Sequence, residues 1–300
     1  MVTARGGLRL RAGLRVPGAG LRLLGPLLHR VRYEVLPTAG AGAAVIEHVP
    51  RAVTVTVTAS PSKGLEPTLA LTERLVGEGF HVVPHLSARL VRDGAHLAEI
   101  VERLTAAGTQ EVFVPAGDAD PPAGRFTSAL DVLEELASLG DPFRRVGITG
   151  YPETHPKITD DVTVQAMWDK RRHATYIVSN LCFDPAVLRQ WIARIRRRGV
   201  TLPLLVGLAG PVDSAKLMQM AAKIGVTDSA RYAAGHGSAL VRLSTPGAYQ
   251  PEQLLDRLGS TLAAPESGVA GLHLFTFNQL QRAEQWRQAL LAQHRDPEAR

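Results

Sequence analysis

Residues 81–116 read HVVPHLSARLVRDGAHLAEIVERLTAAGTQEVFVPA, and this stretch decides the fold. It opens with a short apolar run at His81–Leu86 and closes with another at Glu111–Ala116, both typical of strands covered on both faces. Between the runs lies an apolar stripe at helical spacing that ends at a glycine: Leu97, Ile100, Val101, Leu104 and Gly108. The stretch therefore predicts a strand, a helix and a second strand of a parallel sheet.

The same alternation runs from residue 31 to the end of the chain. Six further strands are predicted, at Val31–Leu36, Val53–Thr58, Val146–Gly150, Tyr176–Asn180, Leu202–Gly207 and Leu272–Phe277. Eight strands, each followed by a helix, predict an α/β protein with a single (β/α)8 TIM barrel, since an open doubly wound sheet usually has fewer strands. The long interval at 226–270, with one helix at Glu252–Leu262, is predicted to be an insertion between the seventh and eighth strands.

The composition excludes several classes of protein. The chain has 300 residues, of which 45% are apolar, and no window approaches the roughly 18 apolar residues of a membrane-spanning helix. The one cysteine, Cys182, rules out a disulfide framework and any multi-thiolate metal site. We therefore expect a cytoplasmic protein without a membrane partner.

The net charge of +6 comes from the first residues of the chain. Residues 1–33 contain seven arginines and no acidic residue, and residues 34–300 contain 27 basic and 28 acidic residues. The predicted barrel is thus close to neutral, so the charge does not indicate a nucleic-acid partner.

Residues 1–30 are predicted to be a basic, disordered extension that precedes a catalytic barrel at 31–300. A transit peptide is also arginine-rich and acid-poor, but this segment has little serine, and glycines break its helical pattern. A basic arm that binds a surface is the third interpretation.

Chemistry in such barrels is built at the carboxyl ends of the strands. Seven of the eight predicted strands carry polar residues there: Glu34, Thr58, His85, Asp118, Tyr151, Glu153, His155, Asn180, Thr276 and Asn278. The seventh strand is followed by Gly207 and Gly210, which would leave room for a ligand.

Glu34 is the strongest candidate for catalysis. It stands in the apolar run 33–37 (YEVLP), where a carboxylate is costly unless it is paired or functional. Burial favours the protonated form that a general acid needs. Asp118 could equally cap a turn, and His85 could equally be a core histidine. The loop at 151–156 (YPETHP) is stiffened by two prolines, as binding loops often are.

Several motifs are absent from the sequence. It has no phosphate-binding Gly-x-x-x-x-Gly-Lys loop, no His-Glu-x-x-His, no Gly-x-Ser-x-Gly and no lysine at a strand end. His81 and His85 are four residues apart but lack a third ligand, so no metal site is predicted.

The motifs at the strand ends resemble those of the methylenetetrahydrofolate reductase family. They are PHLS (84–87), AGD (116–118), YPETHP (151–156), Asn180 with FD (183–184), and FTFN (275–278). They occur in order from about residue 33 to residue 279, and the Tyr-Pro-Glu-x-His-Pro stretch is the most specific.

The resemblance implies reduction of 5,10-methylenetetrahydrofolate to 5-methyltetrahydrofolate by a reduced nicotinamide, within one-carbon metabolism and methionine biosynthesis. Glu34 matches the family's proposed acid, whose proton helps to open the imidazolidine ring. Asp118 matches the aspartate that binds the pterin, and Asn180 stands where a glutamine usually contacts the folate. Thr276 is assigned to the same substrate site.

Thr58, His85, Tyr151 and His155 match positions that line the family's flavin pocket. Two departures weaken that pocket. Ala116 replaces an arginine that contacts the flavin, and the usual phosphate-binding helix end is replaced by 167–175 (MWDKRRHAT). The chain is therefore most similar to the flavin-independent reductases of mycobacteria and related actinobacteria. This similarity implies NADH in the flavin's place, and no FAD.

Lys170, Arg171 and Arg172 within this stretch could supply charge to a pyrophosphate or a 2′-phosphate, or could simply cap a helix. An FAD-dependent reductase with a variant pocket and a non-reductase barrel that binds folate or a pterin are the alternatives. The expected partners are a folate and a nicotinamide nucleotide. The motifs do not distinguish NADH from NADPH, or a monomer from a homo-oligomer.

Overall fold

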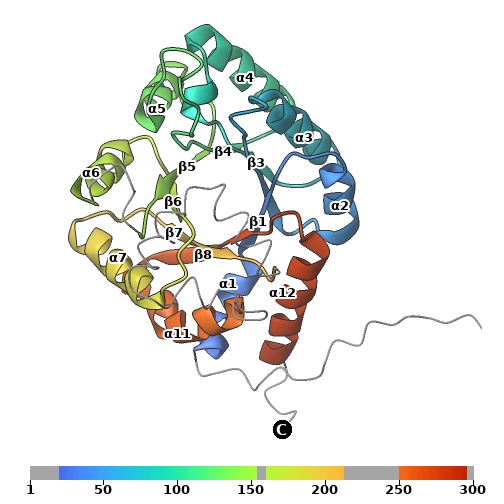
Figure 1. Ribbon diagram of the computed structural model, residues 1–300, viewed down its shortest axis with the longest axis vertical. Helices are drawn as coiled ribbons and strands as arrows, with labels where there is room; N and C mark the ends of the chain where they lie inside the picture. The colour runs from blue at the N-terminus through green and yellow to red at the C-terminus, as the bar shows by residue number, and fades with distance from the viewer. Residues whose placement is uncertain (1–19, 154–159, 213–249, 296–300) are drawn as a thin grey trace, which may run out of the picture.

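The computed structural model describes residues 20–153, 160–212 and 250–295, and these contain eight parallel strands surrounded by helices (Figure 1). The strands are β1 (Val31–Val35), β2 (Thr54–Val57), β3 (Val82–Pro84), β4 (Glu111–Phe113), β5 (Arg145–Gly150), β6 (Tyr176–Ser179), β7 (Leu204–Ala209) and β8 (Val269–Phe275). They are hydrogen-bonded in the order β3-β2-β1-β8-β7-β6-β5-β4. A parallel bridge between His85 and Phe113 joins the two ends of this order. The predicted (β/α)8 barrel is confirmed.

All eight predicted strands are present, with ends that differ by a few residues. β3 and β4 end at Pro84 and Phe113, earlier than predicted. Prolines at 84 and 115 explain the difference, because proline lacks the N–H that extends a ladder. Pairing nevertheless continues past both ends, where His85 N donates to Val57 O, Leu86 N to Phe113 O and Val114 N to Gly147 O (each 2.8 Å).

Helices cover the outside of the barrel (Figure 1). They are α2 (Ala41–His48), α3 (Glu66–Gly77), α4 (Gly94–Ala106), α5 (Ala129–Ser138), α6 (Asp160–Lys170), α7 (Pro185–Arg197), α11 (Pro251–Ala263) and α12 (Leu280–Arg295), with short 3-10 turns η2 (Ala88–Leu90) and η3 (Pro265–Ser267). Asp184 caps the start of α7, since its Oδ1 accepts from Ala186 N (2.7 Å).

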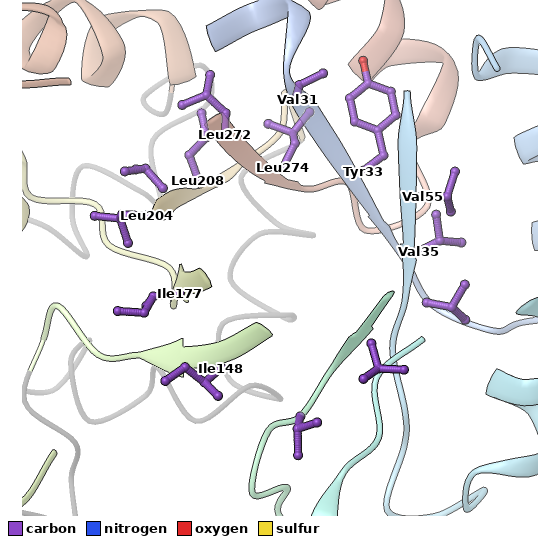
Figure 2. Close-up of a cluster of buried hydrophobic side chains, with 14 of the residues drawn as sticks. Val31, Tyr33, Val35, Val55, Ile148, Ile177, Leu204, Leu208, Leu272 and Leu274 are labelled. Atoms are coloured by element: carbon purple, nitrogen blue, oxygen red, sulfur yellow. The ribbon is translucent and has the colours of Figure 1, made fainter. Parts of the chain in front are cut away.

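Side chains of β1 alternate between the two faces of the barrel wall. Val31, Tyr33 and Val35 belong to the apolar layer between the wall and the helices, part of which Figure 2 shows. Arg32 and Glu34 point the other way, because they meet Glu111 on β4 and His85 after β3, across the barrel. The pleat of one strand thus places two charged side chains inside the barrel, about 7 Å apart along the chain.

The division of the chain at residue 30 stays a prediction. Residues 20–30 were expected to be disordered, but they are folded. Two helical elements lie here: η1 (Leu21–Leu24) and α1 (Gly25–His29). Leu24 and Leu28 are fully buried, and Leu21 N donates to Asp256 Oδ1 on α11 (3.1 Å). Burial of apolar side chains outweighs the low helix propensity of the glycines in this segment. Residues 1–19 lie outside the described residues.

The helix predicted at Glu252–Leu262 is confirmed as α11. It packs against α7 and η1, so it belongs to the ring of helices around the barrel (Figure 1). The rest of the predicted insertion up to residue 249 lies outside the described residues. No described helix is both long enough and apolar enough to cross a membrane.

Candidate active site

Glu34 lies inside the barrel near the carboxyl ends of the strands. Its Oε2 is 3.0 Å from Nε2 of His273 on β8 and 3.9 Å from Nε2 of His85. The side chain is 16% exposed, so a small molecule can still reach it. Among the described residues, no lysine or arginine pairs with Glu34. Its carboxyl group therefore faces imidazoles and no fixed cation.

His85 is buried between Glu34 and the aromatic ring of Phe113, whose centroid lies 4.7 Å from its own. Burial lowers the pKa of His85 to about 4, the charge of Glu34 opposes this shift, and His273 adds to it. The ring is consequently neutral near pH 7. Nε2 is buried and has no hydrogen-bond partner in the described structure. The sequence placed His85 in a cofactor pocket but did not foresee its contact with Glu34.

His273 is the residue of this site that sequence reasoning missed. It is 2% exposed, its ring meets that of Phe275 edge-on at 4.9 Å, and its Nδ1 has no partner in the described structure. A signal was present in the sequence. Leu272 and Leu274 are outward-facing residues of β8, so the polar residue between them had to point into the barrel.

The segment after β8 fixes the backbone of β1. Thr276 Oγ1 donates to Glu34 O (2.5 Å) and is 1% exposed. Asn278, in the left-handed region at φ 59°, accepts from Leu36 N (2.9 Å) and donates to Leu36 O (3.0 Å). Thr276 therefore holds Glu34 in place, and its contact with a substrate stays a prediction.

Thr58 follows β2 at the same end of the barrel. Its N–H donates to Val35 O (2.9 Å), and its carbonyl accepts from Thr68 Oγ1 (2.7 Å). The hydroxyl of Thr58 is buried without a partner in the described structure. Because a buried hydroxyl seeks a hydrogen bond, this group is available to a bound molecule.

Asp118 is exposed, in the loop after β4. Arg89 holds this loop, since its Nε donates to Ala119 O (2.6 Å). The preceding Gly117 has φ +85°, and a Cβ there would lie 2.9 Å from Cβ of Ser87. The sequence at 117 thus requires glycine, and the loop presents Asp118 to solvent from a fixed support.

Tyr151 and Asn180 follow β5 and β6. Burial raises the pKa of Tyr151, the charge of Asp118 adds to the shift, and a hydrogen bond with Thr149 opposes it. The carboxylate of Asp118 therefore lies close enough to Tyr151 to act on its hydroxyl group electrostatically. Asn180 is half-buried, and its Oδ1 accepts from the N–H of the next residue (2.9 Å), which leaves the amide NH2 group for another partner. His155 lies outside the described residues.

Lys170–Arg172 lie at the opposite end of the barrel from Glu34. They follow the last turn of α6 and precede β6, where Thr175 N donates to Val146 O at the start of β5 (2.8 Å). Arg171 stacks on Trp168 at 3.7 Å and donates to its carbonyl (2.6 Å). Of the two predicted roles, the structure supports the helix cap and gives no support to a cofactor phosphate.

His81 and His85 stand at opposite ends of β3 and do not form a pair. His81 Nε2 is 3.6 Å from Glu111 Oε2, near the start of the strands. In the part of the chain that the structure describes, no three His, Cys, Asp or Glu side chains are grouped so that they could hold a metal ion.

The fold and this site define a (β/α)8 barrel with a carboxyl–imidazole cluster at the carboxyl ends of its strands, where barrel enzymes carry their chemistry. The model of the methylenetetrahydrofolate reductase family matches residues 43–229, more than half of the chain. The chain belongs to this family.

Curated relatives match a part of the chain at low identity. Methylenetetrahydrofolate reductase 2 of Saccharomyces cerevisiae is 25% identical over 122 residues, which cover 37% of this chain and 20% of that protein. A probable methylenetetrahydrofolate reductase (NADH) of Oryza sativa subsp. japonica is 28% identical over 130 residues, which cover 36% and 21%. The matches thus span about a fifth of the length of these relatives.

Solved structures share the fold. A protein of Clostridium thermocellum that binds two copies of 5-methyl-5,6,7,8-tetrahydrofolic acid has a TM-score of 0.63 at 10% identity, over 89% of this chain and 98% of that chain. A GH18 chitinase of Pseudoalteromonas aurantia has a TM-score of 0.53 at 11% identity, over 87% and 99%. At these identities the likeness is one of fold.

Proposed function

We propose that the protein reduces 5,10-methylenetetrahydrofolate to 5-methyltetrahydrofolate by direct hydride transfer from NADH, in the cytoplasm. The observation that carries the proposal is Glu34, a carboxyl group near imidazoles and without a cation in a barrel of this family. A carboxyl group in such surroundings can take up a proton and release it, as a general acid must.

In the proposed reaction Glu34 protonates the ring nitrogen that leaves the methylene carbon as the imidazolidine ring opens. The methylene carbon then forms an iminium ion with the other nitrogen and accepts the hydride of NADH. The products are the methyl group and NAD+. Glu34, left as a carboxylate, regains a proton from water, so each cycle consumes one NADH and one proton.

Asp118 is proposed to anchor the pterin. An exposed carboxylate on a fixed loop can accept charge-assisted hydrogen bonds from the amino group and a ring N–H of the pterin. The free amide NH2 of Asn180 is proposed to contact the same substrate. The Clostridium thermocellum protein shows that this fold can hold a reduced folate.

Thr58, His85, Tyr151 and His155 are proposed to contact the nicotinamide nucleotide. The unpartnered Oγ1 of Thr58 and Nε2 of His85 are suited to hydrogen bonds with it. A permanently held flavin would need a cation and several donors for its pyrophosphate. Arg89 already binds its own loop, and the basic run that ends α6 lies at the other end of the barrel. NADH, which binds only transiently, needs less affinity.

An absorption spectrum and an NADH oxidation assay test the proposal. We expect the purified protein to show no flavin absorption and to oxidise NADH only when methylenetetrahydrofolate is present, with 5-methyltetrahydrofolate as product and no flavin added. A yellow protein that loses activity with its flavin would instead establish the FAD-dependent alternative. Folate binding without NADH or NADPH oxidation would establish a binding barrel.

A further inference from the structure

The contact between His273 and Glu34 defines where the imidazole carries its hydrogen. A neutral imidazole has one N–H, and the two nitrogens of His273 have different surroundings. Nε2 lies 3.0 Å from Glu34 Oε2, whereas Nδ1 is buried and has no partner in the described structure. An N–H without a partner costs more than a bare lone pair, since buried N–H groups are almost always bonded. Nε2 therefore holds the hydrogen and donates it to Glu34.

The N–H of His273 stabilises the charged carboxylate that exists after the proton transfer more than the neutral carboxyl group that exists before it. A general acid becomes a carboxylate when it gives up its proton, and here no cation stands by to stabilise that charge. The N–H of His273 is already in place to do so, which is the kind of preorganised stabilisation that enzymes use. Oε1 has no hydrogen-bond partner in the described structure, so it is the oxygen available to a bound molecule.

We propose that His273 is the positioning residue of Glu34, with its Nε2–H holding Oε2 while Oε1 carries the transferred proton. The proposal rests on the proposed function, because it assigns a part of the same reaction. Thr276 supports it from the backbone by its bond to Glu34 O. β8 and the residue that follows it thus fix both the carboxyl group and the main chain of Glu34.

The other ionisable groups around Glu34 do not replace this donor. His85 is neutral near pH 7, and its Nε2 is 3.9 Å from Oε2, beyond hydrogen-bond reach. Arg32, two residues earlier on β1, is paired with Glu111. The Nε2–H of His273 is accordingly the one hydrogen bond to the carboxyl group in the described structure.

Two variants of His273 separate a positioning role from a merely structural one. His273→Ala removes the donor, and His273→Gln retains an N–H near the place of Nε2. For His273→Ala we expect kcat to fall about 10- to 100-fold with KM changed less than about threefold. Loss of a donor to the carboxylate favours the protonated form, so activity should persist to a pH about half to one unit higher. His273→Gln should restore most of kcat and the wild-type pH profile.

The outcomes that would overturn the proposal are specific. If His273→Ala lowers kcat without moving the pH profile, and His273→Gln is equally impaired, the role of His273 is structural. A profile that moves to lower pH would mean that His273 accepts the proton of Glu34. Thermal unfolding of each variant shows whether the barrel remains folded.

A measurement without substrate distinguishes this proposal from the proposed function. Infrared spectra of protein labelled with 13C-glutamate follow protonation of Glu34, and Glu34→Gln identifies its band. We expect the Glu34 carboxyl band to titrate at higher pH in His273→Ala than in wild type. If wild type lacks reductase activity but this shift occurs, the proposed function fails and the contact stands. If wild type is active, and His273→Ala shifts neither the pH profile of activity nor the titration of the Glu34 band, only the assignment of His273 fails.

Discussion

Two carboxylates lie inside the same barrel, one near each end, and their surroundings differ. Glu111, where the strands begin, is 1% exposed, is paired with Arg32, and has Oε2 3.5 Å from Nη1 of Arg145. Glu34, where the strands end, is 16% exposed, and its carboxyl group meets the imidazoles of two histidines. One strand, β1, contributes Arg32 to the first group and Glu34 to the second.

The difference distinguishes Glu111, a carboxylate paired with cations, from Glu34, a carboxyl group that is suited to proton transfer. At Glu111 two guanidinium groups compensate the carboxylate, and that of Arg32 also lies 4.7 Å from the ring centroid of Tyr176. Such an arrangement holds strands together, at the cost of burying its charges. At Glu34 no lysine or arginine among the described residues pairs with the carboxyl group, which contacts imidazoles instead. The first arrangement suits structure and the second suits acid catalysis.

The largest expected effect is on activity, from Glu34→Gln. The amide keeps the shape of the side chain but cannot give up a proton, so reductase activity should fall about 10²- to 10⁴-fold, with folate binding largely kept. Steady-state kinetics and folate titration measure the two properties. Glu47→Gln, at an exposed carboxylate on α2, is the matched control and should behave as wild type. Unchanged activity in Glu34→Gln would remove Glu34 from the mechanism.

Glu111→Gln should show the opposite pattern. It leaves the buried guanidinium of Arg32 without its counter-charge, which typically costs about 3–5 kcal/mol of unfolding free energy. Denaturant unfolding measures this loss, and Glu99→Gln on the surface of α4 is the control. Activity at a temperature where the variant is folded should be close to wild type. If Glu111→Gln instead lost activity while remaining stable, the division between the two ends of the barrel would be wrong.

The pH dependence of stability should report His85. Its pKa in the folded state is about 4, below the ordinary value of 6.5, so the unfolded chain binds more protons between these values. Stability should therefore fall as the pH drops from about 6.5 to 4, by up to about 3 kcal/mol from this group. In His85→Phe the fall over this range should be shallower. Equal slopes for the two proteins would show that His85 is not held neutral by burial.

The smallest expected effect is at Asp118, which is exposed and lies outside both groups. Asp118→Ala should weaken folate binding by about 1.5–3 kcal/mol, the usual worth of a hydrogen bond to a charged group. Isothermal titration measures the affinity, and unfolding should be unaffected because the side chain is exposed. Asp120→Ala in the same loop is the control. Normal folate affinity in Asp118→Ala would contradict the assignment to the pterin.

Much of the fold could be read from the sequence because strands in a parallel barrel are local signals. Each predicted strand is a short apolar run between polar loops, and the confirmed elements include α7 with its Asp184 cap. The extension was predicted less well. Leu24 and Leu28 resemble any leucine-rich leader in sequence, and their burial depends on α11, β8 and α12, which lie more than 200 residues later.

The site was predicted in part for the same reason. Glu34 and His85 could be found because each stands at the end of its own strand. His273 was missed because it becomes significant only beside Glu34, which is 239 residues away in sequence. The basic run at the end of α6 was assigned two roles because the sequence does not show at which end of the barrel it lies.

The sequence by itself determined the order of strands and helices, the inward or outward direction of each strand residue, and the family motifs. These follow from periodicity and residue type, which act over a few residues. Only the tertiary structure decided which inward residues meet. Closing the barrel sets β8 beside β1 and β4 beside the end of β3, and that geometry gives Glu111 its arginines and Glu34 its histidines. The partners come from different strands, Arg32 and Glu111 being 79 residues apart and Glu34 and His273 239 residues apart, so their electrostatic partnership exists only once the ring is closed.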